Sequence, residues 1–219
     1  MMKKNIAIFL SFIFLSFQAV KADMAIGITG AVHMLDASGT ETTRQSGQKN
    51  TGSHSEEALV PEIFFEVGDS ATFGVAYIPT RELGSKSRSD TSTTGDSQDT
   101  GTYTAKAELE NVIQLYTDIP VTAYAGADVY VKLGIQHATI ATLESLNSGS
   151  TYPNQDVLGY TLGLGAKGDL PYGNNLFYKA DVTYTDFEDY EASDEAGTGN
   201  KVAAELEDIA VKFSVGYKF

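Results

Sequence analysis

The last twelve residues, 208–219, read DIAVKFSVGYKF and alternate between two kinds of side chain. The apolar parity consists of Ile209, Val211, Phe213, Val215, Tyr217 and Phe219. The other parity consists of Asp208, Ala210, Lys212, Ser214, Gly216 and Lys218. Successive side chains of a β-strand point to opposite faces, so this stretch predicts a strand with one apolar face.

The same alternation recurs along the chain and predicts seven further strands, at residues 25–35, 58–67, 71–80, 102–117, 121–135, 157–169 and 175–187. One face of each of the eight segments lacks charged residues, and Asn111 is its one strongly polar exception. Short links at 68–70, 118–120 and 171–174 alternate with long links at 36–57, 83–101, 144–156 and 188–200. This alternation predicts an all-β fold, an eight-stranded antiparallel up-and-down β-barrel.

Two barrel classes fit that topology, and the distribution of charge distinguishes them. A soluble lipocalin-type barrel turns its apolar face inward, whereas an outer-membrane barrel turns it toward lipid. The charge-free faces span about ten residues, which is the length a tilted strand needs to cross a bilayer. The opposite faces carry Glu62, Glu66, Lys106, Glu108, Glu110, Asp128, Lys132, Lys167, Lys179, Asp181, Asp208 and Lys212. These nearly balanced charges favour the transmembrane barrel with a polar interior.

The ending Val215-Gly216-Tyr217-Lys218-Phe219 resembles the terminal aromatic signal by which outer-membrane barrels are recognised for assembly. Residues 23–219 as a whole look like the small OmpA/OmpX-like barrels of Gram-negative bacteria. The resemblance implies an integral outer-membrane protein with long loops outside the cell and both termini in the periplasm. It also implies a bare barrel without a periplasmic domain, and an assembly role for Tyr217 and Phe219.

Charged side chains inside a narrow barrel must be paired or hydrated. Counting from the short turns predicts a charge network across the lumen, formed by Glu108, Glu110, Asp128, Lys132, Lys179, Asp181 and Lys212. Eight strands enclose a space that side chains can fill. We therefore expect a filled, structural lumen, and the alternative is a narrow porin-like channel for small ions or solutes.

The amino terminus predicts a secretory signal peptide over residues 1–22. Lys3 and Lys4 precede an apolar run at 6–17, and Ala22 supplies the small residue before cleavage. The full chain carries 15 basic and 29 acidic residues, a net charge of −14, which disfavours a nucleic-acid partner. With no cysteine, the chain has no disulfide or thiol chemistry.

Two other features suggest chemistry only weakly. His137-Ala138-Thr139, with Glu144 downstream, resembles the His-x-Ser of outer-membrane lipid A deacylases, but Thr139 stands where that pattern has serine. We therefore expect no enzyme activity and no cofactor. The acidic stretch 186–195 has oxygen ligands that suit weak binding of divalent cations, although the EF-hand spacing is absent. The partners we expect are outer-membrane lipid or lipopolysaccharide and the assembly machinery.

Overall fold

The computed structural model describes residues 23–68, 71–90, 100–144, 150–171 and 175–219. Within them the strands are β1 (Met24–Thr42), β2 (Lys49–Val67), β3 (Thr72–Ile78), β4 (Arg81–Asp90), β5 (Gly101–Tyr124), β6 (Ala127–Glu144), β7 (Gln155–Asp169), β8 (Leu176–Phe187), β9 (Tyr190–Ser193) and β10 (Lys201–Lys218). The predicted signal peptide, residues 1–22, lies outside the described residues and stays a prediction.

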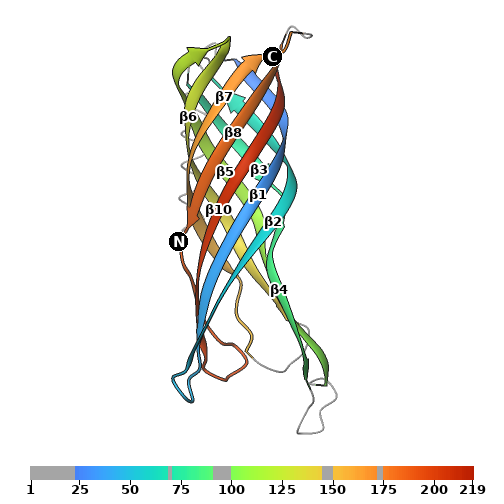
Figure 1. Ribbon diagram of the computed structural model, residues 1–219, viewed down its shortest axis with the longest axis vertical. Helices are drawn as coiled ribbons and strands as arrows, with labels where there is room; N and C mark the ends of the chain where they lie inside the picture. Colours follow the sequence, from blue (N-terminus) through green and yellow to red (C-terminus); the bar gives the residue numbers. More distant parts are fainter. Residues whose placement is uncertain (1–22, 69–70, 91–99, 145–149, 172–174) are drawn as a thin grey trace, which may run out of the picture.

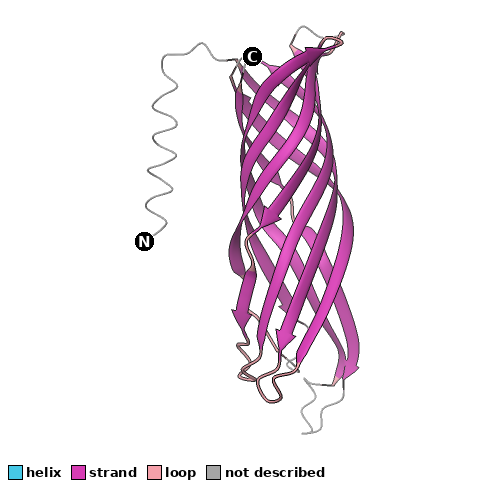
Figure 2. Cartoon of the chain, turned by 60° about the vertical axis from the view of Figure 1, so that its left-hand side comes forward, coloured by secondary structure: helices cyan, strands magenta, loops and turns pink. Residues whose placement is uncertain are grey.

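The strands form one closed antiparallel barrel (Figures 1 and 2). β3 and β4 both pair with β5, one after the other, and β8 and β9 both pair with β10 in the same way. The ten segments therefore form eight wall strands of the barrel, which we call staves. The ladder between β1 and β10 closes the ring, from Ala25↔Lys218 to Thr42↔Lys201. The predicted eight-stranded up-and-down barrel is confirmed.

The staves extend much further toward the long-loop end than the sequence alone predicts. β1 and β2 remain paired as far as Thr42↔Lys49, which leaves only residues 43–48 as their loop. Residues 83–90, expected as part of a loop, belong to strand β4, and residues 201–207 belong to β10. The expected loops at 36–57, 83–101 and 188–200 are therefore partly wrong, because their Ser, Thr and Gly residues pair in extended hairpins.

The turn expected at 118–120 is also wrong. β5 continues to Tyr124, and the reversal occurs at Ala125 and Gly126, whose φ angles are 52° and 84°. Two consecutive positive φ values are typical of the two-residue type I′ hairpin turn, which matches the twist of the strands it connects. Pro120 is accommodated inside the strand because the register shifts between Pro120 and Thr122.

A β-bulge in β5 reverses the parity of that strand. The register with β6 shifts between Glu110 and Ile113, and Asn111 between them has a φ of 54°. An extra residue in a strand moves every later side chain to the other face. Consequently Leu109 before the bulge and Val112 after it are both buried inside the barrel. The expectation that 103–109 present their odd-numbered residues to lipid is wrong, and Asn111, the polar exception, marks the bulge.

One seam in the wall lacks main-chain pairing. The β2–β3 ladder ends at Ile63↔Tyr77, and its register, continued by two residues, would place Pro61 opposite Pro79. Neither proline has an N–H to donate, so the ladder cannot continue. Beyond this point, within the described residues, no backbone ladder joins β2 to β4, although His54 packs beside Gly84. Figure 1 shows β2 and β4 separating toward the loop end.

The outer surface carries a band of exposed apolar side chains around the ring. Its most exposed members include Ile28, Ile63, Phe73, Val121, Leu164, Val182, Val211 and Phe213. A monomeric soluble protein rarely exposes a contiguous apolar surface of this size. In the residues that the structure describes, no helix has the length and apolarity to cross a bilayer.

Candidate functional site

A dense ion-pair cluster fills the lumen near the short-turn end. We call it the inner cluster, and it consists of Glu66, Asp118, Asp181, Lys132, Lys167 and Lys179. Lys179 contacts both Glu66 and Asp118, and its Nζ lies 2.5 Å from Asp118 Oδ2. Lys132 Nζ lies 2.6 Å from Asp118 Oδ1 and 3.7 Å from Asp181. Each of the three carboxylates therefore faces at least one lysine from another stave.

Two tyrosines complete the inner cluster. Tyr116 donates to Glu66 at 2.8 Å and Tyr130 donates to Asp181 at 2.6 Å, which occupies further lone pairs of these carboxylates. The Lys132 ammonium also lies 3.7 Å from the centre of the Tyr116 ring, a cation–π geometry. The Tyr130 ring occupies the space where Gly165 has no side chain. Burial of these charges is thus matched by hydrogen bonds, as a dry interior requires.

A second cluster lies further toward the loops. We call it the outer cluster, and it consists of His33, Glu62, Arg81, Asp208 and Lys212. Lys212 donates to both oxygens of Glu62, at 2.8 and 3.0 Å, and Glu62 also accepts from His33 Nε2 at 2.9 Å. On the other side, Arg81 Nη1 reaches Asp208 at 2.7 Å and His33 Nδ1 at 2.6 Å. His33 Nδ1 also lies 2.8 Å from Asp208 Oδ2, so the imidazole bridges the two carboxylates of the cluster.

Uncharged hydrogen-bonding side chains fill a layer of their own. Thr161 and Thr185 lie 2.9 Å apart, and the Gln136 amide donates to both hydroxyls at 3.2 and 3.0 Å. Gln114 donates to the same Thr161 hydroxyl at 3.2 Å. The four side chains come from β5, β6, β7 and β8, so they tie one half of the ring together across the lumen.

The charges in the two clusters cancel. Five carboxylates, Glu62, Glu66, Asp118, Asp181 and Asp208, face five bases, Arg81, Lys132, Lys167, Lys179 and Lys212. All but Lys167 are 6% exposed or less. A water-filled channel past these side chains would leave them accessible, so this part of the lumen is filled.

Apolar side chains close the loop half of the lumen. This apolar plug includes Leu35, Val60, Ile78, Leu83, Leu109, Val112, Ala138, Ile140, Val157, Phe187, Tyr190 and Leu206. Each of them is at most 7% exposed. Their side chains point into the barrel because they occupy the strand positions opposite to those that face lipid in the membrane band. The plug separates the charged lumen from the loops.

The loops are joined to one another above the plug. Glu41 accepts from Tyr152 at 2.9 Å and from Asn200 at 3.3 Å, which connects three loop regions. Burial and the adjacent Glu41 carboxylate raise the pKa of Tyr152 to about 12. Asp194 accepts from the Thr151 amide at 2.7 Å and from Thr198. These hydrogen bonds outweigh burial, which acts in the opposite direction, and lower the pKa of Asp194 to about 2.

The structure places the predicted network residues in three different environments. Lys132, Lys179 and Asp181 lie in the inner cluster, and Lys212 lies in the outer cluster. Asp128 follows the turn at 125–126 and is exposed at the mouth of the barrel, outside both clusters.

Glu108 and Glu110 are not in the lumen. They precede the bulge and alternate with the buried Leu109, so their side chains face outward. Glu108 pairs there with Lys106 at 2.6 Å, and the Lys106 ammonium also contacts Glu82 at 3.0 Å. Their predicted lumen position is wrong because the bulge at Asn111 reverses the parity from which it was counted.

Sequence reasoning missed Asp118 and Arg81 and gave His33 no role. Asp118 was assigned to a turn, whereas it lies inside β5. Arg81 was assigned to no element, because the predicted strand ended at 80 and the predicted loop began at 83, whereas it begins β4. The inward position of His33 follows from the parity of β1, and its two carboxylate neighbours come from β2 and β10.

The remaining candidate residues lie on outer or loop surfaces. Tyr217 faces outward at the end of β10, and the Phe219 amide donates to the Met24 carbonyl at 2.9 Å. His137 is exposed, and Thr139 donates to Asp156 at 2.8 Å. The side chain of Glu144 lies outside the described part of the chain. Within the described residues, no group of three or more His, Asp or Glu side chains is placed to hold a metal ion.

Comparison with known proteins gives similarity in fold. No family model and no curated protein matches the sequence. Among solved structures, OprG from Pseudomonas aeruginosa matches with a TM-score of 0.61 and 18% identity, over 90% of this chain and 96% of OprG. The outer membrane protein AlkL matches at 0.47 and 13%, over 90% of both chains. The protease OmpT from Escherichia coli matches at 0.45 and 9%, over 92% of this chain and 99% of OmpT.

The protein thus has the fold of the small outer-membrane β-barrels. It is a single ring of eight antiparallel staves.

Proposed function

We propose that the protein is an integral outer-membrane barrel with a structural and surface-interaction role, and that its lumen does not conduct. The observation that carries this proposal is the complete pairing of charge in the lumen: five carboxylates face five bases beneath an apolar plug. A pore needs an aqueous path, whereas these side chains exclude water. The exposed apolar band supports insertion in a membrane.

The orientation we propose places the short turns and both termini in the periplasm and the hairpins outside the cell. The hairpins project beyond the apolar band and carry exposed hydroxyl and acidic side chains, as a surface in contact with lipopolysaccharide and water would. Tyr217 and Phe219 remain proposed as the assembly signal. The acidic segment 186–195 remains a proposed site of weak divalent-cation association.

Electrical recording in planar bilayers tests the central claim. Refolded wild-type protein should give no conductance above background across the accessible voltage range. Lys212→Ala, which removes one side chain from the outer cluster, is the matched variant for detecting a latent path. Discrete channel openings by the wild type would contradict a sealed lumen and would support the narrow channel for small ions or solutes.

The wall seam favours a second candidate function, also of the transport class. The seam beside Pro61 and Pro79 borders the apolar plug, since Val60 and Ile78 belong to the plug and precede these prolines. A small apolar solute that enters among the loops would therefore meet an apolar lumen and a wall without hydrogen bonds. We propose lateral passage toward lipid as the alternative to a purely structural role.

Liposome uptake separates the two functions. Vesicles that contain the barrel should take up a fluorescent apolar probe no faster than empty vesicles if the role is structural. Faster uptake that is lost in the double variant Pro61→Val, Pro79→Val would establish the lateral path, because the added N–H groups allow the ladder to close.

A further inference from the structure

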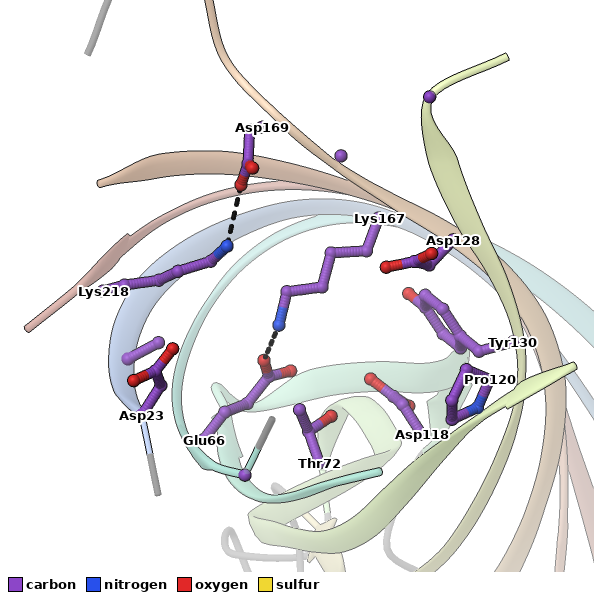
Figure 3. Close-up of a pocket in the computed structure, with 14 residues that line it drawn as sticks. Asp23, Glu66, Thr72, Asp118, Pro120, Asp128, Tyr130, Lys167, Asp169 and Lys218 are labelled. Carbon is purple, nitrogen blue, oxygen red and sulfur yellow. Dashed lines mark hydrogen bonds and ion pairs between the residues drawn. The ribbon is translucent and has the colours of Figure 1, made fainter. Parts of the chain in front are cut away.

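A cavity of about 150 Å³ opens at the short-turn end of the barrel, below the inner cluster. Residues from several strands around the ring line it. Asp23 precedes β1, Thr72 begins β3, and Asp118 and Asp128 come from β5 and β6. Figure 3 shows these side chains around a common space, with Lys167 extending across it toward Glu66. The cavity lies at the mouth of the barrel, and Glu66, Asp118 and Lys167 of the inner cluster form part of its wall.

The wall of this cavity carries more carboxylates than its basic side chains neutralise. Lys218 pairs with Asp169 at 2.7 Å, and the carboxylates of the inner cluster are matched by that cluster's lysines. Asp128 remains in excess of these bases. Asp128 makes no ion pair or hydrogen bond within the described residues, although Lys167 lies opposite it in the β6–β7 register. The cavity therefore has a surplus of negative charge.

A buried hydroxyl gives an independent indication of a ligand. Thr72 lines the cavity and is 5% exposed, yet its Oγ1 has no hydrogen-bond partner among the described residues. Figure 3 places Thr72 between Glu66 and Asp118. A buried polar atom without a partner costs about 1–3 kcal/mol, so such an atom calls for a partner inside the cavity. The Thr72 oxygen can accept a hydrogen bond from a cation.

The chemistry of the wall selects the kind of cation. Its carboxylates are distributed around the cavity and, within the described residues, are not grouped as a metal ion requires. An ammonium group has three donors that point in different directions, and it can bond separated acceptors. A volume of about 150 Å³ has room for several waters or for one small organic ammonium ion. We propose that this cavity binds a primary ammonium group through Thr72 Oγ1 and the carboxylates that surround it, Asp128 among them.

One source of that ammonium is the protein itself. Cleavage after Ala22, on which this source rests, would free the α-amino group of Asp23, a residue that lines the cavity. The Gly68 amide donates to the Asp23 carbonyl at 3.0 Å and holds this residue at the mouth. A free small amine is the other source, and it has the same chemistry.

Two preparations of the barrel in detergent micelles distinguish the sources. The first is exported and processed protein, whose amino terminus is verified by mass spectrometry. The second is refolded protein that begins three residues before Asp23, so that its α-amine lies beyond the cavity. The pH dependence of acylation gives the pKa of the α-amine in the first preparation. NMR signals of Thr72 and Asp128, titrated with ethylammonium or with ethanol as a neutral control, report on the cavity in both.

We expect the α-amine pKa of the processed protein to lie about one unit above its usual ~8, a tenfold shift in its protonation equilibrium. Asp128→Asn should remove at least half of this shift. Asp169→Asn is the matched control, because the Asp169 carboxylate is already paired with Lys218. Ethylammonium, and not ethanol, should perturb Thr72 and Asp128 in the extended chain.

The same titration of the processed protein identifies the source. No effect of ethylammonium there means that the chain's own terminus fills the cavity, and an equal effect means that the cavity takes a free amine. An unshifted α-amine together with no ethylammonium effect in either preparation would overturn the proposal and leave the cavity to water. Cleavage at another residue would remove only the self-derived source, and neither result depends on whether the lumen conducts.

Discussion

Lys212 Nζ donates to both carboxylate oxygens of Glu62, across the lumen from β10 to β2, at 2.8 and 3.0 Å. Both side chains are 6% exposed or less, so neither charge can turn to water if the other is lost. Removal of one partner of a buried ion pair is far more costly than replacement of both. The pair therefore gives a direct measure of how dry the lumen is.

Lys212→Ala should lower the free energy of unfolding by about 3–5 kcal/mol, because the buried charge of Glu62 then loses the ammonium that contacts both of its oxygens. The double variant Lys212→Met, Glu62→Leu should recover most of this loss. Urea unfolding in detergent, followed by the mobility shift of unheated protein in SDS gels, measures both. A single variant as stable as the wild type would mean that water reaches Glu62.

Valine in place of both Pro61 and Pro79 should stabilise the barrel by about 1 kcal/mol for each hydrogen bond that the β2 edge gains. The amides of the β2 edge beside the seam should then become protected from hydrogen exchange. Pro171→Val, in a short link away from the seam, is the control. Unchanged exchange at the seam would show that something other than the missing donors keeps the two edges apart.

Asn111→Gly should be tolerated, whereas Asn111→Val should destabilise the barrel by about 1–2 kcal/mol. The reason is the φ of 54° at this position, which glycine adopts freely and a β-branched residue adopts at a cost. Thermal unfolding of the two variants in the same detergent makes the comparison. Equal stability would indicate that the bulge can relax into regular strand.

The contact between the loops at Asp194 should persist to low pH. The folded pKa of Asp194 is about 2, below its usual 3.8, so the ionised form contributes stability that is complete above about pH 4. That contribution falls as pH drops through 2, where the carboxylate is protonated. NMR signals of the Thr151 and Thr198 amides, which donate to Asp194, should therefore stay constant from pH 7 to pH 4. Asp194→Asn should shift them at pH 7.

The sequence was sufficient to predict the class of fold because alternation is set by the strand itself and needs no knowledge of neighbours. It located the inward side of β6, β8 and β10, hence Lys132, Lys179, Asp181 and Lys212. It failed on β5, where one extra residue near Asn111 changes the parity without changing the composition.

Which charged side chains pair with each other could not be predicted from the sequence, for a different reason. Partners such as Glu66 and Lys179 lie 113 residues apart and meet only through the register and shear of the closed ring. The turn at Ala125 was equally hidden, because alanine is uncommon at a positive φ and Pro120 nearby is the stronger local turn former.

The long sequence separations in the lumen also bear on how the barrel is made. The carboxylates of β2 find their lysines on β8 and β10, and β10 must pair with β1 before the ring is complete. A partly assembled sheet would therefore hold the two β2 carboxylates, Glu62 and Glu66, in water, since their lysines would not yet be beside them. Desolvation of these two carboxylates therefore depends on closure of the ring between β1 and β10.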